Sequence, residues 1–283
     1  MAPRAYWKGY LRLSLVTCPV ELYPATSLAE RTHFHMINKD TGNRLHQQMV
    51  DEKTGEVVDR ASKGRGYEVS KGRYVEIEEE ELDAIEIEST HTVDIDSFVP
   101  RAEIDNRYLD RPYYIAPGDK IGAEAFAVIR DAMRNKDRVA LARIVTGHRE
   151  HVIALEPLGE GILGTMLRYD YEVRDEGPVF SEIPSAKASR DMVELAEHIL
   201  DSKAGHFDPQ KFRDRYETAL RALVKRKAAG KPIEAPHKPR PSAEVIDLMD
   251  ALKRSVAGGK AARAGKTPRR KAAKATKTRR KAA

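Results

Sequence analysis

Short stretches in which apolar and polar residues alternate recur between residues 10 and 169, and they constrain the fold more than any other feature. In the first of them, Leu11, Leu13 and Leu15 are separated by polar residues, which is the period of a strand with one buried face. The pattern predicts two strands within residues 10–24 and further strands at 84–98, 111–116, 139–145, 151–158 and 162–169. One helix is predicted at 123–135, because its apolar positions share a face. The chain is therefore expected to be a β-rich α+β protein.

From Ser189 onward the apolar residues recur at helical spacing, which predicts the first helix of the C-terminal part. A second helix is predicted to open at Asp208, with Pro209 at its first position, and to stop at Gly230. Residues 231–241 hold four prolines and are predicted to form a linker. A short third helix, capped by Ser242, is expected to follow.

This third helix carries its apolar residues on one stripe: Val245, Leu248, Met249 and Leu252. An amphipathic helix of about ten residues is not stable alone in water. We therefore expect it to dock on this domain or on another protein.

The positive charge of the chain is segregated at its C-terminus. The net charge is +6, from 50 Lys and Arg against 44 Asp and Glu. Residues 253–283 hold 13 of the basic residues and none of the acidic ones, which leaves 37 against 44 elsewhere. Residues 257–283 have too little apolar surface to fold, so we predict a disordered tail that contacts DNA through residues such as Arg269, Arg270 and Lys271. A solubilising tail or a localisation signal would give the same composition.

Residues 33–60 are too polar to form a core element. Turn signals at Asp40–Asn43 and Lys53–Glu56 predict a three-stranded ribbon. The ribbon is either an exposed hairpin insertion or an arm that gains its order from a partner. Just beyond it, Lys63 and Arg65 stand between glycines, where backbone and cations can approach phosphates.

Signatures of enzyme chemistry are absent from the sequence. It has no Walker loop, no G-x-G-x-x-G and no G-x-S-x-G, and its single cysteine, Cys18, excludes a disulfide framework and a cysteine-based zinc finger. His33 and His35 are expected to be solvated and not to bind metal. No apolar run approaches the roughly 20 residues of a membrane span, and no secretory signal is recognisable at the start. We expect a soluble, intracellular protein that is not an enzyme, although a lysine that forms a Schiff base with abasic sugars stays open.

An ordered set of segments between about residue 4 and residue 225 resembles the prokaryotic Ku proteins. The segments are Arg4 to Gly9, Leu11 to Val16, Pro19 to Tyr23, Phe34 to Arg44, Lys63 to Glu68, Tyr74 to Leu82, Ile85 to Ile87, Pro112 to Pro117 and Arg149 to His151. No single segment is decisive, but their order is specific. Some relatives carry Cys-x-x-Cys in the region where this chain has Asp51 to Gly55, so we predict no zinc and no cofactor.

The resemblance implies a homodimeric ring that encircles double-stranded DNA. Each protomer would supply a Ku-type β-barrel and half of a narrow bridge. The ring would load on DNA ends without reading sequence, and would recruit the ATP-dependent ligase D in non-homologous end joining. The protein would then act in the cytoplasm, at the bacterial nucleoid. The implied domains are a core at 1–183 with its bridge arm at about 34–67, a helical arm at 184–230, a linker with a ligase-interacting helix at 231–256, and a disordered basic tail at 257–283.

The residues that we predict to line the ring are cations: Lys39, Arg44, Arg60, Lys63, Arg65, Arg143 and Arg149. Val245, Leu248 and Leu252 are predicted to contact the ligase. Two other classes of function remain as alternatives, which are an end-processing lyase or nuclease and a histone-like compaction protein.

Overall fold

The computed structural model of the chain describes residues 4–86, 90–147 and 149–231. It divides into two compact units, Met1–Gly177 and Pro178–Ala283. The predicted linker, ligase-interacting helix and basic tail, from residue 232 onward, lie outside the described residues.

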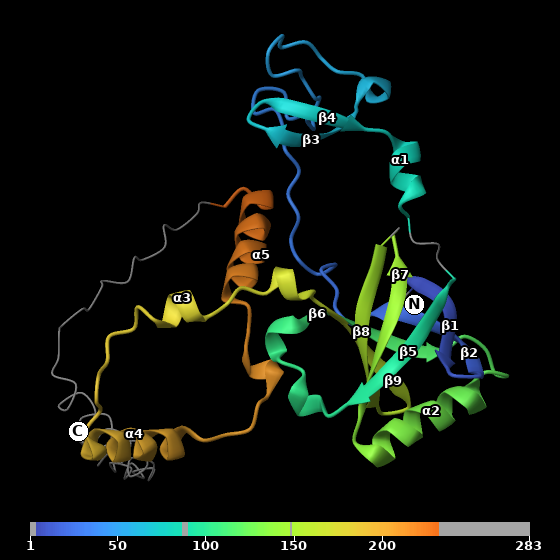
Figure 1. The fold of residues 1–283 in the computed structure, drawn as a ribbon. Helices are drawn as coiled ribbons and strands as arrows, with labels where there is room; N and C mark the ends of the chain where they lie inside the picture. Colours follow the sequence, from blue (N-terminus) through green and yellow to red (C-terminus); the bar gives the residue numbers. More distant parts are fainter. Residues whose placement is uncertain (1–3, 87–89, 148, 232–283) are drawn as a thin grey trace, which may run out of the picture. The chain divides into compact units, whose positions relative to one another are not determined.

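Seven strands of the first unit close into a barrel in the order β1-β2-β6-β9-β8-β7-β5 (Figure 1). Their bounds are Trp7–Leu13 (β1), Val16–Pro24 (β2), Thr92–Val99 (β5), Leu109–Pro117 (β6), Val139–Thr146 (β7), Arg149–Leu158 (β8) and Gly161–Leu167 (β9). Neighbouring strands are antiparallel until β5 meets β1 in parallel, where Leu11 lies opposite Val93. This parallel pair closes the barrel.

The barrel interior is filled from alternate positions of its strands. Leu11, Leu22, Ile115, Ile153 and Leu155 are almost completely buried, as the period-two pattern predicts. Helix α2 (Ala123–Lys136) packs against β2 and β8. It buries three apolar side chains, Phe126, Ile129 and Met133, in the same core.

Alternation misleads at the strand ends. Leu15 was predicted to continue the buried face of the first strand, but it is 97% exposed because it lies in the turn between β1 and β2. The predicted strand at 84–98 is also wrong in its first half: β5 begins only at Thr92, and Ile85 is an exposed residue at the end of a helix. A short alternating run does not distinguish a strand from a turn beside it.

The region between β2 and β5 has its own small elements. The predicted ribbon at 33–60 is wrong as a regular sheet, because its strands are reduced to the isolated bridges Ile37–Arg44 and Val50–Val57. A separate two-stranded sheet follows, formed by β3 (Arg65–Ser70) and β4 (Arg73–Ile77). Helix α1 (Glu79–Ala84) comes next. Three glutamates lie in its first turn, where the helix dipole favours negative charge.

The second unit contains helices α4 (Arg190–Lys203) and α5 (Arg215–Ala228), and a short helix α3 (Gly177–Phe180) begins at the boundary. The predicted start of the second helix at Asp208 is wrong. Asp208 caps a single 3-10 turn, and α5 begins seven residues later with Asp214 as its cap. Short 3-10 turns lie at Arg60–Ser62, Arg101–Glu103, Asn106–Tyr108, Asp170–Glu172 and Pro209–Lys211.

The described part of the second unit has no buried residue. The apolar stripe of α4, which includes Met192 and Leu195, is only half-buried, and Phe207 and Phe212 are largely exposed. In the described ranges, no helix combines the length and the apolar character that crossing a membrane requires.

The parallel joint of the barrel depends on the absence of a side chain at residue 9. A methyl group on Gly9 would collide with the backbone carbonyl oxygen of His91 and with the ring of Trp7, and a carbonyl next to the joint cannot move aside easily. We expect Gly9→Ala to lower the free energy of unfolding by about 1–3 kcal/mol, measured by urea denaturation. Gly118→Ala is the matched control, because its methyl would make ordinary contacts at 3.4 Å with Pro19. Equal stability of the two variants would contradict this account of the joint.

Candidate nucleic-acid interface

Two tight turns in the region 36–58 have the same hydrogen bonds, 13 residues apart. In the first, the Asn38 side chain accepts a hydrogen bond from the backbone N–H of Asp40 at 2.8 Å, and the Gly42 N–H donates to the Asn38 carbonyl at 2.8 Å. In the second, the Asp51 carboxylate accepts from the N–H groups of Lys53 and Thr54 at 2.8 and 2.9 Å. Gly55 repeats the bond of Gly42, at 2.9 Å to the Asp51 carbonyl.

These turns derive their order from side-chain caps and glycines. Gly42 and Gly55 both have φ of 73°, in the left-handed region that favours glycine. The two N–H bonds lower the pKa of the Asp51 carboxyl. Burial contributes little, because nearly all of residues 33–60 are exposed. The two turn positions predicted from sequence are therefore confirmed.

The arm, which we define as residues 34–67, presents exposed cations on this frame. Lys39 lies inside the first turn, Arg44 follows it and Arg60 begins a 3-10 turn. Within the described ranges, none of the three has a carboxylate within 4 Å. Their full charge is available to an anionic partner.

Lys63 and Arg65 have a different environment. They line a small cleft of about 220 Å³ together with four glutamates: Glu76, Glu78, Glu79 and Glu80. Arg65 lies 3.5 Å from the Glu79 carboxylate, and both side chains are mostly exposed. These glutamates thus lie beside the two cations and reduce the attraction of Lys63 and Arg65 for a phosphate.

Arg143 of β7 is neutralised on the barrel surface. Its guanidinium donates to Asp96 at 2.7 Å and to Glu150 at 3.0 Å, and these ion pairs raise its pKa. Two carboxylates for one cation leave this patch negative, which disfavours a phosphate contact at Arg143.

Arg149 of β8 keeps its charge. Its guanidinium lies 5.4 Å from the ring centroid of Tyr169, and it donates to the hydroxyl of Tyr171. The two tyrosine rings are stacked, with centroids 5.7 Å apart. The stack holds the guanidinium in place without neutralising it.

Arg149 lines a polar cavity of about 380 Å³ with two arginines that the sequence reasoning missed, Arg111 and Arg168. Arg168 donates to Asp110 at 2.6 Å and to the carbonyl of Arg107 at 3.1 Å. These arginines come from β6, β8 and the end of β9, which are neighbours in the barrel. Spacing along the chain does not reveal that these arginines lie close together, because their proximity depends on which strands pair and in which register.

His151 also lines this cavity. Partial burial, Arg149 and Arg111 lower the pKa of its imidazole, against the opposing effect of Glu172 and Asp110. The imidazole is therefore neutral at pH 7, and the charge of the cavity comes from its arginines and their two carboxylate neighbours.

Several predicted site residues lie outside the described ranges, namely Arg269, Arg270 and Lys271 of the tail and Val245, Leu248 and Leu252 of the third helix. In the ranges that are described, no three His, Cys, Asp or Glu side chains gather as metal ligands would. The absence of zinc stays a prediction.

The state of His151 gives a pH dependence of stability. The unfolded chain binds a proton near the ordinary pKa of 6.5, whereas the folded chain binds it only at lower pH. Stability is therefore retained above pH 6.5 and falls as the pH drops through that value. We expect the melting temperature of His151→Gln to fall less than that of the wild type between about pH 7.5 and pH 5.5. His33→Gln, at an exposed site, is the control and should match the wild type. Equal slopes for all three proteins would contradict the assignment.

Comparison with known proteins agrees with this fold. Residues 12–195 match the family model of the Ku70/Ku80 beta-barrel domain. The chain is similar to the non-homologous end joining protein Ku of Bradyrhizobium sp. (strain ORS 278), with 61% identity over 92% of this chain and 89% of that protein. The proteins of the same name in Cereibacter sphaeroides and Allorhizobium ampelinum are each 42% identical, and the matches cover 96% and 97% of those proteins and 90% and 91% of this chain. The closed barrel, the family match and the length of these alignments show that the chain belongs to the Ku family.

Proposed function

We propose that this protein binds the ends of double-stranded DNA without reading base sequence and acts in non-homologous end joining. The observation that carries the proposal is the arm, whose cations Lys39, Arg44 and Arg60 are exposed and have no ion-pair partner in the described ranges. Exposed cations on an ordered backbone are suited to contact phosphates, which are the same for every base pair. The printed name of the relatives, non-homologous end joining protein Ku, supports the pathway.

The neutralisation of the barrel surface supports binding by the arm. Arg12 is paired with Asp94, Arg143 with Asp96 and Glu150, and Arg101 with Glu156. Where charge is internally compensated in this way, the barrel attracts DNA only weakly. The cations of the arm, Arg149 and the basic residues after 252 then supply the attraction.

We propose further that two copies close a ring. The described part of the second unit buries no residue, and the half-buried stripe of α4 and the exposed Phe207 and Phe212 give it apolar surface to cover. A second copy supplies a self-complementary surface, as in most homodimers. A closed ring needs no base contacts, because its topology retains the DNA.

The segment at 231–256 is proposed to bind the ATP-dependent ligase D through Val245, Leu248 and Leu252, and the residues from 257 onward to add affinity for DNA. The protein would then work at the DNA of the bacterial nucleoid, in the cytoplasm. It holds the ends and leaves the chemistry of sealing to the ligase.

Access to free ends is the first test. A ring must thread onto a terminus, so linear duplex with free ends should bind, whereas the same duplex closed by bulky caps at both ends before addition of the protein should not. Binding is read by gel shift at moderate salt, with covalently closed circles of equal length as a second comparison. Binding to capped and circular DNA as strong as binding to the free-ended duplex would overturn the ring and favour a histone-like compaction protein. Shortened or cleaved end label in the presence of a divalent metal would instead show an end-processing lyase or nuclease.

The salt dependence of binding identifies the phosphate contacts. Each lost contact should reduce the slope of log K against log salt concentration by about 0.9. The double variant Lys39→Ala/Arg44→Ala should therefore reduce the slope by nearly two. Arg143→Ala is the matched control and should leave it unchanged, because Arg143 is already paired with two carboxylates. A larger loss for Arg143→Ala would show that DNA displaces these carboxylates.

A further inference from the structure

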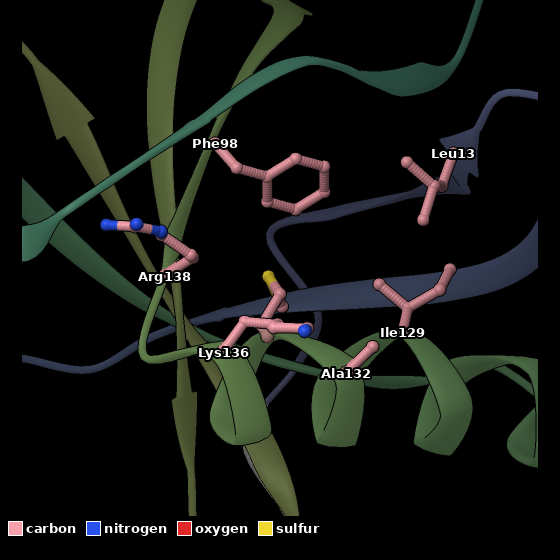
Figure 2. A pocket seen from close by; sticks show the side chains of 7 residues that line it. Leu13, Phe98, Ile129, Ala132, Lys136 and Arg138 are labelled. Atoms are coloured by element: carbon pink, nitrogen blue, oxygen red, sulfur yellow. The ribbon is translucent and has the colours of Figure 1, made fainter.

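Two cavities of the first unit have the same volume, about 380 Å³, but opposite linings. The first is an apolar groove, and Figure 2 shows Phe98 on its strand side and Ile129 of helix α2 on its helix side. The second is the polar cavity that Arg111, Arg149 and Arg168 line. Guanidinium groups bind carboxylate and phosphate groups better than any other side chain does. The polar cavity therefore has the chemistry of an anion site.

The polar cavity has more positive than negative charge. Asp110 is shared by Arg168, at 2.6 Å, and Arg111, at 3.4 Å, so one carboxylate serves two cations. Among the described residues, Arg149 has no carboxylate within 4 Å and lies against tyrosine rings instead. The other carboxylate of the lining, Glu172, accepts a backbone N–H at 2.8 Å. With a neutral imidazole, three guanidinium groups and two carboxylates leave a charge of +1.

Neutral hydrogen-bond donors also line the cavity. Tyr113 is only 6% exposed, and burial raises the pKa of its phenol, so the hydroxyl keeps its proton at neutral pH. Its ring lies beside that of Tyr6, with the centroids 5.3 Å apart. Thr146 and His151 belong to the same lining. A recess that combines guanidinium groups with protonated hydroxyls can surround the several oxygens of a phosphate group.

His151 links the charge of the cavity to a proton. Partial burial lowers the pKa of its imidazole, as do Arg149 of the same strand and Arg111 of β6, whereas Glu172 and Asp110 oppose this shift. An anion between the two arginines cancels their effect on the imidazole. With His151 protonated, the charge of the cavity becomes +2, which matches the charge of about −2 on a phosphomonoester near neutral pH. A phosphodiester of the DNA backbone carries only about −1.

We propose that this cavity binds a phosphomonoester group between Arg111 and Arg149, and that His151 takes up a proton from solvent as the group binds. The site differs from the phosphate contacts proposed for the arm, which meet phosphodiesters on an open surface. The group can belong to a free compound or to the terminal phosphate of a DNA strand. The second source rests on the proposed function, whereas the first does not.

Nuclear magnetic resonance of the full-length protein, without DNA and without phosphate buffer, tests the site directly. The imidazole signal of His151 is assigned by its loss in His151→Gln. Methyl phosphate should raise the pH at which this signal titrates by about one unit, whereas dimethyl phosphate, the matched diester, should leave it unchanged. No shift with methyl phosphate, or an equal shift with both compounds, would overturn the proposal.

Two substitutions test which cations hold the group. The Arg111 side chain is 76% exposed, so Arg111→Gln removes a charge without a loss of packing, and it should weaken methyl phosphate binding about tenfold. Arg149→Gln should weaken it at least as much. Arg138→Gln, at the rim of the apolar groove, is the matched control and should bind as the wild type does. Binding is read from the His151 signal at increasing methyl phosphate concentration, and equal binding by all four proteins would overturn the site.

Duplexes with one free end identify the source of the group. The other end is closed by a bulky cap, and the free end carries either a terminal phosphate or a terminal hydroxyl. A shift of the His151 titration with only the phosphorylated duplex would assign the site to the DNA end. Equal responses to the two duplexes, with methyl phosphate still bound, would assign it to a free phosphomonoester. Failure of both duplexes to bind would contradict the proposed function and leave the methyl phosphate result standing.

Discussion

The parallel pairing of β1 with β5 is the constraint on which the rest of the first unit depends. It brings Leu11 opposite Val93 and closes a barrel whose other joints are antiparallel. Because β2 ends at Pro24 and β5 begins at Thr92, the chain between them is an excursion from the barrel. None of the described residues in this stretch belongs to the buried core, so core packing restricts their sequence little.

The ion pairs of the barrel differ from those of the arm. On the barrel, arginines such as Arg12 and Arg143 are paired with carboxylates on neighbouring strands, which compensates their charge, whereas Arg149 rests on tyrosine rings and is not neutralised. The arm instead carries Lys39 and Arg44 without partners in the described ranges. Under the proposed function, a ring around DNA needs attraction along its inner contact and little elsewhere, and the free cations of the arm agree with that proposal.

The sequence predicted the barrel well because one-sided burial is a local signal. The strands at 111–116, 139–145, 151–158 and 162–169 are confirmed within a few residues. Leu15 and Ile85 were misjudged because a turn or a helix end can continue an alternating pattern by chance. The start at Asp208 was misjudged because Asp214 repeats the capping signal six residues later. Arg111 and Arg168 could not be assigned to one cavity, because their proximity depends on strand register and not on spacing along the chain.

The paired turns of the arm have a consequence for how this part of the molecule changes. Each turn is fixed by one capping side chain, Asn38 or Asp51, by one glycine, and by a threonine hydroxyl, Thr41 or Thr54, that accepts a backbone N–H. Nearly every other position of both turns is exposed. Substitutions at those other positions therefore cost little folding energy, and the surface chemistry of the arm is free to diverge while its backbone path is kept. Selection or design can therefore change the surface charge of the arm, and with it the affinity for DNA that we propose, without altering the core of the barrel.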